Sequence, residues 1–297
     1  MRLLDRILCF GFEVGQKDVI DEQVLENELN HSQLVVIDNV AEYFFSQRIQ
    51  DFFTTADFPC VMLPFELSFL EFRFPKGRIE TVCDEVGVSL AMCSPDDMRP
   101  LHPNIFGREE VVYCLTGYIF VRQHGSREAV LMAEYLLPVG IDGGIISPDN
   151  GKIHGVTYLF TPGISEEAKE YNLRFVHQIV NFPTCLALSF MHCRNVRVQE
   201  ISPPPKLAKA HQRRRRRPLL TYHVLEIDHM KSVLEREGRA STSGLQKALH
   251  ICRGHFATYG KDGKGLLFGK HSGRYWIPMH TRGSVEQGMV VKDYAVR

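Results

Sequence analysis

Ser68-Phe69-Leu70-Glu71-Phe72-Arg73-Phe74, followed by Pro75-Lys76-Gly77, is the clearest indication of fold in this 297-residue chain. The segment alternates in places between apolar and polar residues, as in a β-strand with two distinct faces, and Pro-Lys-Gly is a turn signal. Further segments of the middle region have the composition of strands, namely residues 79–83, 86–93, 110–115, 117–122 and 156–160. Gly- and Pro-rich loops separate them, so we expect a mostly antiparallel sheet.

Helical patterns precede and follow this sheet along the chain. Residues 16–31 carry apolar side chains at helical spacing, and a second helix is expected after Asp38, a good N-cap. A third begins at Ser165, with acidic residues in its first turn, and leads past a kink at Pro183 to residues 186–191. The expected fold class is α+β, with an N-terminal mostly antiparallel sheet, packed helices and a small β-rich C-terminal module.

A segment rich in proline and arginine divides the chain. Three prolines at 203–205 are followed by five consecutive arginines: Arg213, Arg214, Arg215, Arg216 and Arg217. Because such a segment cannot bury itself, we interpret residues 201–218 as an exposed linker. It would join a recognition domain, residues 1–200, to a basic β-rich nucleic-acid module, residues 219–297. Within that module we expect strands at 219–227, 245–256, 266–271 and 274–277, and a short helix at 230–237.

The net charge of zero conceals a division between the two parts of the chain. From Ile201 onward there are 19 Lys and Arg residues against 7 Asp and Glu residues, a net charge of +12, so the first 200 residues carry −12. Such asymmetry indicates an anionic partner for the C-terminal part. The alternative is that the two parts neutralise each other within the fold.

Cysteine usage and hydropathy indicate the compartment. The eight cysteines are scattered with no CxxC pair, a pattern more typical of reduced cytosolic thiols than of a disulfide framework. No apolar run approaches the roughly 18 to 20 residues of a transmembrane helix, and we identify no signal peptide. We expect a cytoplasmic protein that does not contact a membrane.

The densest group of chemically active residues is His250-Ile251-Cys252-Arg253-Gly254-His255, with Tyr259 nearby. Histidine and arginine are what metal-free RNA cleavage needs. One histidine takes the proton of a 2′-hydroxyl, a cation stabilises charge on phosphorus, and a second group protonates the leaving oxygen. We therefore predict His250, His255, Arg253 and Tyr259 as catalytic residues, with no metal and no cofactor.

Other basic and aromatic residues of the module are candidates for contact with nucleic acid. Lys270, Arg274 and Arg282 would bind phosphate, as would the five arginines, and Trp276 would stack on an unpaired base. Three alternatives remain open: a core role for Trp276, buried structural histidines, and a zinc site formed by His250, Cys252 and His255 with His271 or His280.

Several segments together resemble a family of phage and mobile-element proteins. They are Met191-His192-Cys193-Arg194-Asn195-Val196, Pro204-Pro205-Lys206-Leu207, the arginine run, residues 218–225, His250-Ile251-Cys252-Arg253-Gly254-His255-Phe256 and Trp276-Ile277-Pro278. The best-known members are type V-A anti-CRISPR proteins, which lower the mRNA of a Cas effector nuclease during translation. Cys252 stands where those relatives carry arginine.

The resemblance implies a division of labour between the two parts of the chain. The N-terminal domain would select a protein partner, such as a nascent or folded chain, and the basic module would act on the attached mRNA in a bacterial host cell. We expect an RNA-binding protein, as an endoribonuclease directed at target mRNA or as a non-enzymatic adaptor on messenger or ribosomal RNA. A zinc-stabilised binding module is the third possibility.

Overall fold

The computed structural model describes most of the chain, and it does so as two compact units. The described residues are 1–14, 21–46, 57–74, 83–98, 100, 109–146, 156–158, 175–227, 248–252, 254–260, 265–267, 270–277, 280–282 and 284–289. The first unit comprises Met1–Met191 and Val198–Leu225, and the second comprises His192–Arg197 and Glu226–Arg297. The expected boundary at residues 201–218 therefore falls inside the first unit.

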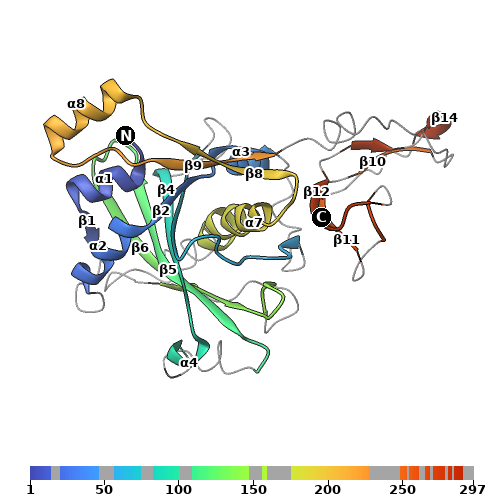
Figure 1. Ribbon diagram of the computed structural model, residues 1–297, viewed down its shortest axis with the longest axis horizontal. Coiled ribbons are helices and arrows are strands. Elements are labelled where there is room, and N and C mark those ends of the chain that lie inside the picture. The colour runs from blue at the N-terminus through green and yellow to red at the C-terminus, as the bar shows by residue number, and fades with distance from the viewer. Residues whose placement is uncertain are drawn as a thin grey trace. The chain divides into compact units, whose positions relative to one another are not determined.

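A nine-stranded mixed sheet forms the centre of the first unit (Figure 1). The strand order is β1-β6-β5-β4-β3-β2-β9-β8, with β7 also paired to β6. The strands are β1 (Phe12–Val14), β2 (Gln33–Val36), β3 (Leu67–Arg73), β4 (Cys83–Cys93), β5 (Tyr113–Gln123), β6 (Ala129–Val139), β7 (Val156–Tyr158), β8 (Val196–Ile201) and β9 (Tyr222–Ile227). The α+β class is confirmed.

Pairing within the sheet is antiparallel from β3 through β4, β5 and β6 to β7, as expected for the middle of the chain. Toward the edges it is parallel, since β1 runs parallel to β6, and β2 runs parallel to both β3 and β9. The strand predicted at 219–227 thus belongs, as β9, to the sheet of the first unit. It pairs with β2 and lies outside the core of the predicted C-terminal module.

Strand β5 is one strand where we expected two, at 110–115 and 117–122, because Thr116 stays in the ladder opposite Ala91. Its neighbour Gly117 lies opposite Leu90, where β4 and β5 approach each other closely. A Cβ at this position would lie 1.8 Å from the carbonyl oxygen of Ser89, so only glycine fits. Strand β4 likewise runs unbroken from Cys83, and the other residues predicted as a strand at 79–82 lie outside the described part of the chain.

Helices pack on both faces of the sheet. Side chains of strand β3 contribute to the apolar core on each face. Phe69 belongs to a core with Leu3 of helix α1 (Leu3–Phe10) and residues of α2 (Glu22–His31). Phe72, of opposite parity, lies 6.3 Å from Phe45 of α3 (Asp38–Ser46), measured between ring centroids. Figure 1 shows α1 and α2 on one side of the sheet and α7 on the other. Aromatic residues of opposite parity in β3 thus serve two different cores.

The predicted helices correspond to observed ones with shifted bounds. Helix α2 begins after Asp21, whose side chain accepts hydrogen bonds from the amides of Gln23 and Val24. The helix predicted from Ser165 is described only from a π-helical turn, Phe175–Asn181, which continues as α7 (Phe182–Met191). Pro183 is the second residue of α7 and directly follows the π-helical turn. Residues 230–237 lie outside the described residues.

The second unit contains two small sheets. One has three strands in the order β13-β10-β14, which are His280–Arg282, Ala248–Cys252 and Ser284–Met289. The other is the antiparallel pair β11 (His255–Tyr259) and β12 (Gly273–Ile277). The single strand predicted at 245–256 is thus two strands in two sheets. Of the strand predicted at 266–271, Leu267 and His271 form an isolated bridge, and residues 268 and 269 lie outside the described residues.

Candidate nucleic-acid interface

Part of the predicted linker is a helix, α8 (Pro205–Arg215). Pro205 occupies the first turn, where proline is favoured, and the residues that follow are mostly strong helix formers. Arg213, Arg214 and Arg215 lie in the last turn, where cations interact favourably with the helix dipole. The segment is exposed, as expected, since α8 has no buried residue. Exposure does not prevent a helix, and the sequence analysis had not predicted one in this segment.

One side of α8 contacts α1 (Figure 1). His211 Nε2 lies 3.8 Å from the Cys9 sulfur, and the guanidinium carbon of Arg215 lies 4.6 Å from the centre of the Phe10 ring. Because Ala208 and His211 are the half-buried residues of the helix, this side faces the protein. The contacts fix the orientation of α8 on the first unit.

Two arginines of the run, Arg215 and Arg217, make contacts within the protein. Arg217 donates hydrogen bonds to Asn30 Oδ1 at 2.9 Å and to Glu26 Oε1 at 3.2 Å. Its carbonyl oxygen lies 3.0 Å from His211 Nδ1. Arg217 therefore anchors the end of the run to α2, as Arg215 anchors α8 to α1. Arg213, Arg214 and Arg216 are exposed.

The opposite side of α8 carries a row of cations. Lys206, Lys209 and Arg213 are spaced i, i+3, i+7, which places them on one helical face. At about 100° per residue, this face points away from Ala208, His211 and Arg215. All three cations are exposed. We call Lys206, Lys209 and Arg213 the cationic stripe. It extends about 10 Å along the helix, enough to follow several phosphates of a nucleic-acid strand.

The lysines of the stripe were not among the predicted site residues. Their i, i+3, i+7 spacing with Arg213 is visible in the sequence, but it has meaning only if the segment is helical. Because residues 201–218 were interpreted as a linker, a shared helical face of these cations was not predicted.

The predicted catalytic histidines lie in different sheets of the second unit. In the β10–β13 ladder, His250 pairs with Arg282 and Cys252 pairs with His280. His255 lies in β11 opposite Ile277 and is exposed. Arg253 lies outside the described residues. Backbone register thus brings together His250 and Arg282, a potential base and a potential phosphate ligand, but puts His255 in another ladder.

Tyr259 and Lys270 lie toward the other end of the β11–β12 pair. Tyr259 pairs with Gly273, and its ring centre lies 6.0 Å from that of Tyr275, which is buried. The side chain of Arg194 crosses Gly273, where a Cβ would lie 2.6 Å from Arg194 Nε. Lys270 is exposed. Arg194 is therefore a cation of this surface that the sequence reasoning missed, because only the fold brings it to β12.

Trp276 belongs to the core of the second unit. It is 5% exposed, and its ring centre lies 4.8 Å from that of Phe256. Asn195 donates to the Trp276 carbonyl at 2.7 Å and accepts from the Trp276 amide at 2.9 Å. A ring so enclosed offers no open face to a nucleobase, so the core role is the one the structure supports. The adjacent Arg274 is half-buried, and its Nε has no hydrogen-bond partner among the described residues.

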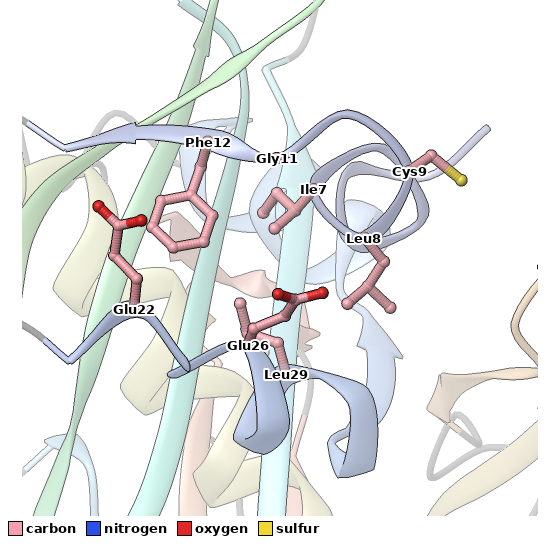
Figure 2. Close-up of a pocket in the computed structure, with 8 residues that line it drawn as sticks. All are labelled: Ile7, Leu8, Cys9, Gly11, Phe12, Glu22, Glu26 and Leu29. Atoms are coloured by element: carbon pink, nitrogen blue, oxygen red, sulfur yellow. The ribbon is translucent and has the colours of Figure 1, made fainter. Parts of the chain in front are cut away.

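A small pocket lies between α1 and α2 in the described part of the chain. Its volume is about 190 Å³, and its lining comprises Ile7, Leu8, Cys9, Gly11, Phe12, Glu22, Glu26 and Leu29. Figure 2 shows the Cys9 side chain turned away from Phe12 and Glu22. The pocket is smaller than the roughly 300 to 1,000 Å³ of small-molecule sites, so the surface of α8 is the better candidate.

Within the described ranges, no three His, Cys, Asp or Glu side chains form a group suited to a metal ion. No helix in that part of the chain is both long and apolar enough to cross a membrane. Comparison with known proteins gives no match to a family model, to a curated protein or to a solved structure. The resemblance to anti-CRISPR proteins therefore stays a prediction.

Proposed function

We propose that this protein binds RNA through the cationic stripe of α8. The observation that carries the proposal is the two-sided use of the helix: Arg215 and Arg217 hold it to the protein, whereas Lys206, Lys209 and Arg213 point away. Cations that merely stabilised the fold would be expected to contact acidic residues, as Arg217 does with Glu26. A fixed row of cations instead suits a ligand with regularly spaced negative charges.

The physical basis of binding would be neutralisation of phosphates and release of counterions. Each phosphate contact on a single strand contributes about −0.7 to the slope of log K against log salt concentration. The stripe carries no groups arranged to read base edges, so we expect little sequence preference. Selection of one message would then need a second interaction, such as contact of the N-terminal domain with a nascent chain on the ribosome. The family resemblance supports such a partner in the cytoplasm of a bacterial host.

Binding of labelled single-stranded RNA, followed by fluorescence anisotropy, tests the proposal. The Lys209→Glu, Arg213→Glu variant should lose at least tenfold in affinity. A matched control, Arg127→Glu, Arg197→Glu, changes two exposed arginines outside α8 by the same net charge and should retain most of the affinity. Equal losses in both variants would show that net charge, not the stripe, governs binding, and would refute the proposal.

RNA cleavage by the second unit is a second candidate function, favoured by the cross-strand pairing of His250 with Arg282 and by the exposure of His255. His250 or His255 would act as base, and Arg253, Arg282 or Lys270 would stabilise the phosphate, with Tyr259 nearby. Purified protein in chelator should then convert labelled mRNA to products ending in 2′,3′-cyclic phosphate, alone or on translating ribosomes. The His250→Ala, His255→Ala variant should bind RNA but not cleave it. Binding without cleavage by the unmodified protein would leave the adaptor as the function.

A further inference from the structure

Two cysteines face each other across the β4–β5 ladder. Cys93 is the last residue of β4, Cys114 is the second residue of β5, and the two are direct partners in the antiparallel register. Directly opposed residues in such a ladder have Cβ atoms about 4.5 to 5.5 Å apart. A disulfide needs about 3.5 to 4.5 Å between the Cβ atoms. A small local adjustment of the strand ends therefore suffices to join them.

The two sulfur atoms already interact. The Cys114 thiol hydrogen-bonds to the Cys93 sulfur, which lowers the pKa of Cys93 to about 7. Burial opposes this shift, the Thr116 hydroxyl reinforces it through a second hydrogen bond, and the nearby Asp97 carboxylate opposes it. The lowered pKa favours the thiolate of Cys93, and thiolate is the reactive form.

The two cysteines differ in exposure, as a reaction that begins at one thiol and ends at the other requires. Cys93 is half-buried, so a small reagent can reach it, whereas Cys114 is fully buried. Cys114 lies in a small apolar cluster with Met98, Val111 and Leu136, and Cys93 packs against it. A reagent would therefore meet Cys93 first, and Cys114 would react only from within the protein.

The other cysteines whose side chains the structure describes lack this combination. Cys60 and Cys193 are buried. Cys185 is fully buried beside the Tyr135 hydroxyl, and burial raises the pKa of its thiol to about 12. Burial also raises the pKa of the half-buried Cys9, which interacts with His211. Cys83 is buried and lies opposite Gln123. Reactivity should therefore concentrate at the pair.

We propose that Cys93 and Cys114 form a site of reversible modification by low-molecular-weight disulfides such as oxidised glutathione. The Cys93 thiolate attacks one sulfur of the reagent and forms a mixed disulfide, and one glutathione thiolate leaves. Cys114 then gives up its proton and attacks the Cys93 sulfur, which releases the second glutathione. In total, two protein thiols are oxidised to one disulfide, and one oxidised glutathione is reduced to two thiols. Excess reduced glutathione reverses both steps.

The cross-link would tie β4 to β5 at one end of their ladder. It would enclose residues 94–113, including α4 (Pro95–Met98) and the apolar contact of Met98 with the sheet. The site lies in the first unit and involves no residue of α8. It is therefore independent of RNA binding by the stripe.

Incubation of the full-length reduced protein in glutathione redox buffers, followed by acid quenching, alkylation and peptide mass spectrometry, tests the proposal. The unmodified chain should give one intramolecular disulfide, between Cys93 and Cys114, which dithiothreitol reverses. Cys114→Ala should stop at the mixed disulfide and carry one glutathionyl group on Cys93. Cys93→Ala should leave Cys114 unmodified.

Cys9→Ala provides the matched control, because it removes a half-buried cysteine outside the pair and should leave the cross-link intact. Circular dichroism before and after oxidation establishes that the reaction occurs in the folded chain. The redox titration of the unmodified chain is decisive without the variants. Complete alkylation of Cys93 and Cys114 under strongly oxidising glutathione, or a cross-link to any other cysteine, would overturn the proposal.

Discussion

Glu71 accepts a hydrogen bond from the backbone amide of Leu4 at 3.1 Å, so a buried carboxyl of β3 caps the first turn of α1. Its other oxygen lies 3.8 Å from Arg2 Nε, and Arg2 also bonds to Asp38 at 3.0 Å. The N-terminal helix is thus joined to the sheet by polar contacts as well as by the apolar core around Leu3 and Phe69.

This arrangement predicts a specific dependence of stability on pH. Burial raises the pKa of Glu71 to about 7, against smaller opposing effects of the Leu4 amide and Arg2, and Glu85 and Asp38 raise it further. Since the folded chain holds this proton more tightly than the unfolded chain, the stabilisation is complete below the ordinary value of 4.5. It is lost as pH rises through about 7. Its size is on the order of 3 kcal/mol.

Urea denaturation at several pH values measures this effect. Glu71→Gln keeps an acceptor for the Leu4 amide but cannot ionise, so its free energy of unfolding should lose this decline between pH 4.5 and 7. Glu110→Gln, at an exposed position, should behave like the unmodified protein. An unchanged decline in Glu71→Gln would show that other groups cause it.

Single substitutions should separate the two roles within the arginine run. Arg213→Ala should reduce the steepness of the salt dependence of RNA binding by about 0.7, the contribution of one phosphate contact. Arg217→Ala should leave that steepness nearly unchanged but expose α8 to faster amide hydrogen exchange, because the bonds to Glu26 and Asn30 are lost. Identical behaviour of the two variants would contradict the division of roles.

The double hydrogen bond between Asn195 and the backbone of Trp276 should stabilise the second unit. Asn195→Ala leaves a buried amide and carbonyl unpaired, at a cost of roughly 2 to 4 kcal/mol. Trp276 is the lone tryptophan, so its fluorescence during urea denaturation reports this unit alone. The midpoint should fall in Asn195→Ala and stay unchanged in Thr258→Ala, an exposed position of β11. Equal midpoints would show that the bonds contribute little.

Gly117 should be among the least tolerant positions of the sheet. In Gly117→Ala the new methyl group meets the Ser89 carbonyl, so β4 and β5 must separate, at a cost of at least about 3 kcal/mol. Gly87→Ala meets the Phe69 ring, a side chain that can turn, and should cost less. Urea denaturation of both variants gives the comparison, and a larger loss for Gly87→Ala would contradict it.

The fold was predictable where periodicity was unambiguous. The alternation of 68–74 correctly gave a central strand, because its two faces meet two different apolar cores. Strand β6 was missed, since its Ala, Leu and Met residues favour helices when read alone. Its conformation is set by pairing with β5, which no local pattern reveals.

The candidate site was less predictable because it depends on which segments meet. His250 and His255 are close in sequence, but they belong to ladders with different partners, Arg282 and Ile277. For Trp276 the sequence left base stacking and a core role open, and only its contacts with Phe256 and Asn195 show that it is enclosed. The arginine run was correctly expected to be exposed. Its proline- and arginine-rich composition indicated a linker, so the helix that gives the cations a common face was not predicted.

The path of the chain between the two units has a consequence for how such a protein can change over evolution. The chain passes from one unit to the other after Met191, after Arg197 and after Leu225. No single cut separates the units: one made after Leu225 would leave the second unit without Asn195, and one made after Met191 would carry β9 and α8 away from the sheet. A recombination event with one crossover would damage a unit wherever it fell. The two units therefore cannot be exchanged between proteins as separate segments. We expect them to vary by residue substitution rather than by recombination.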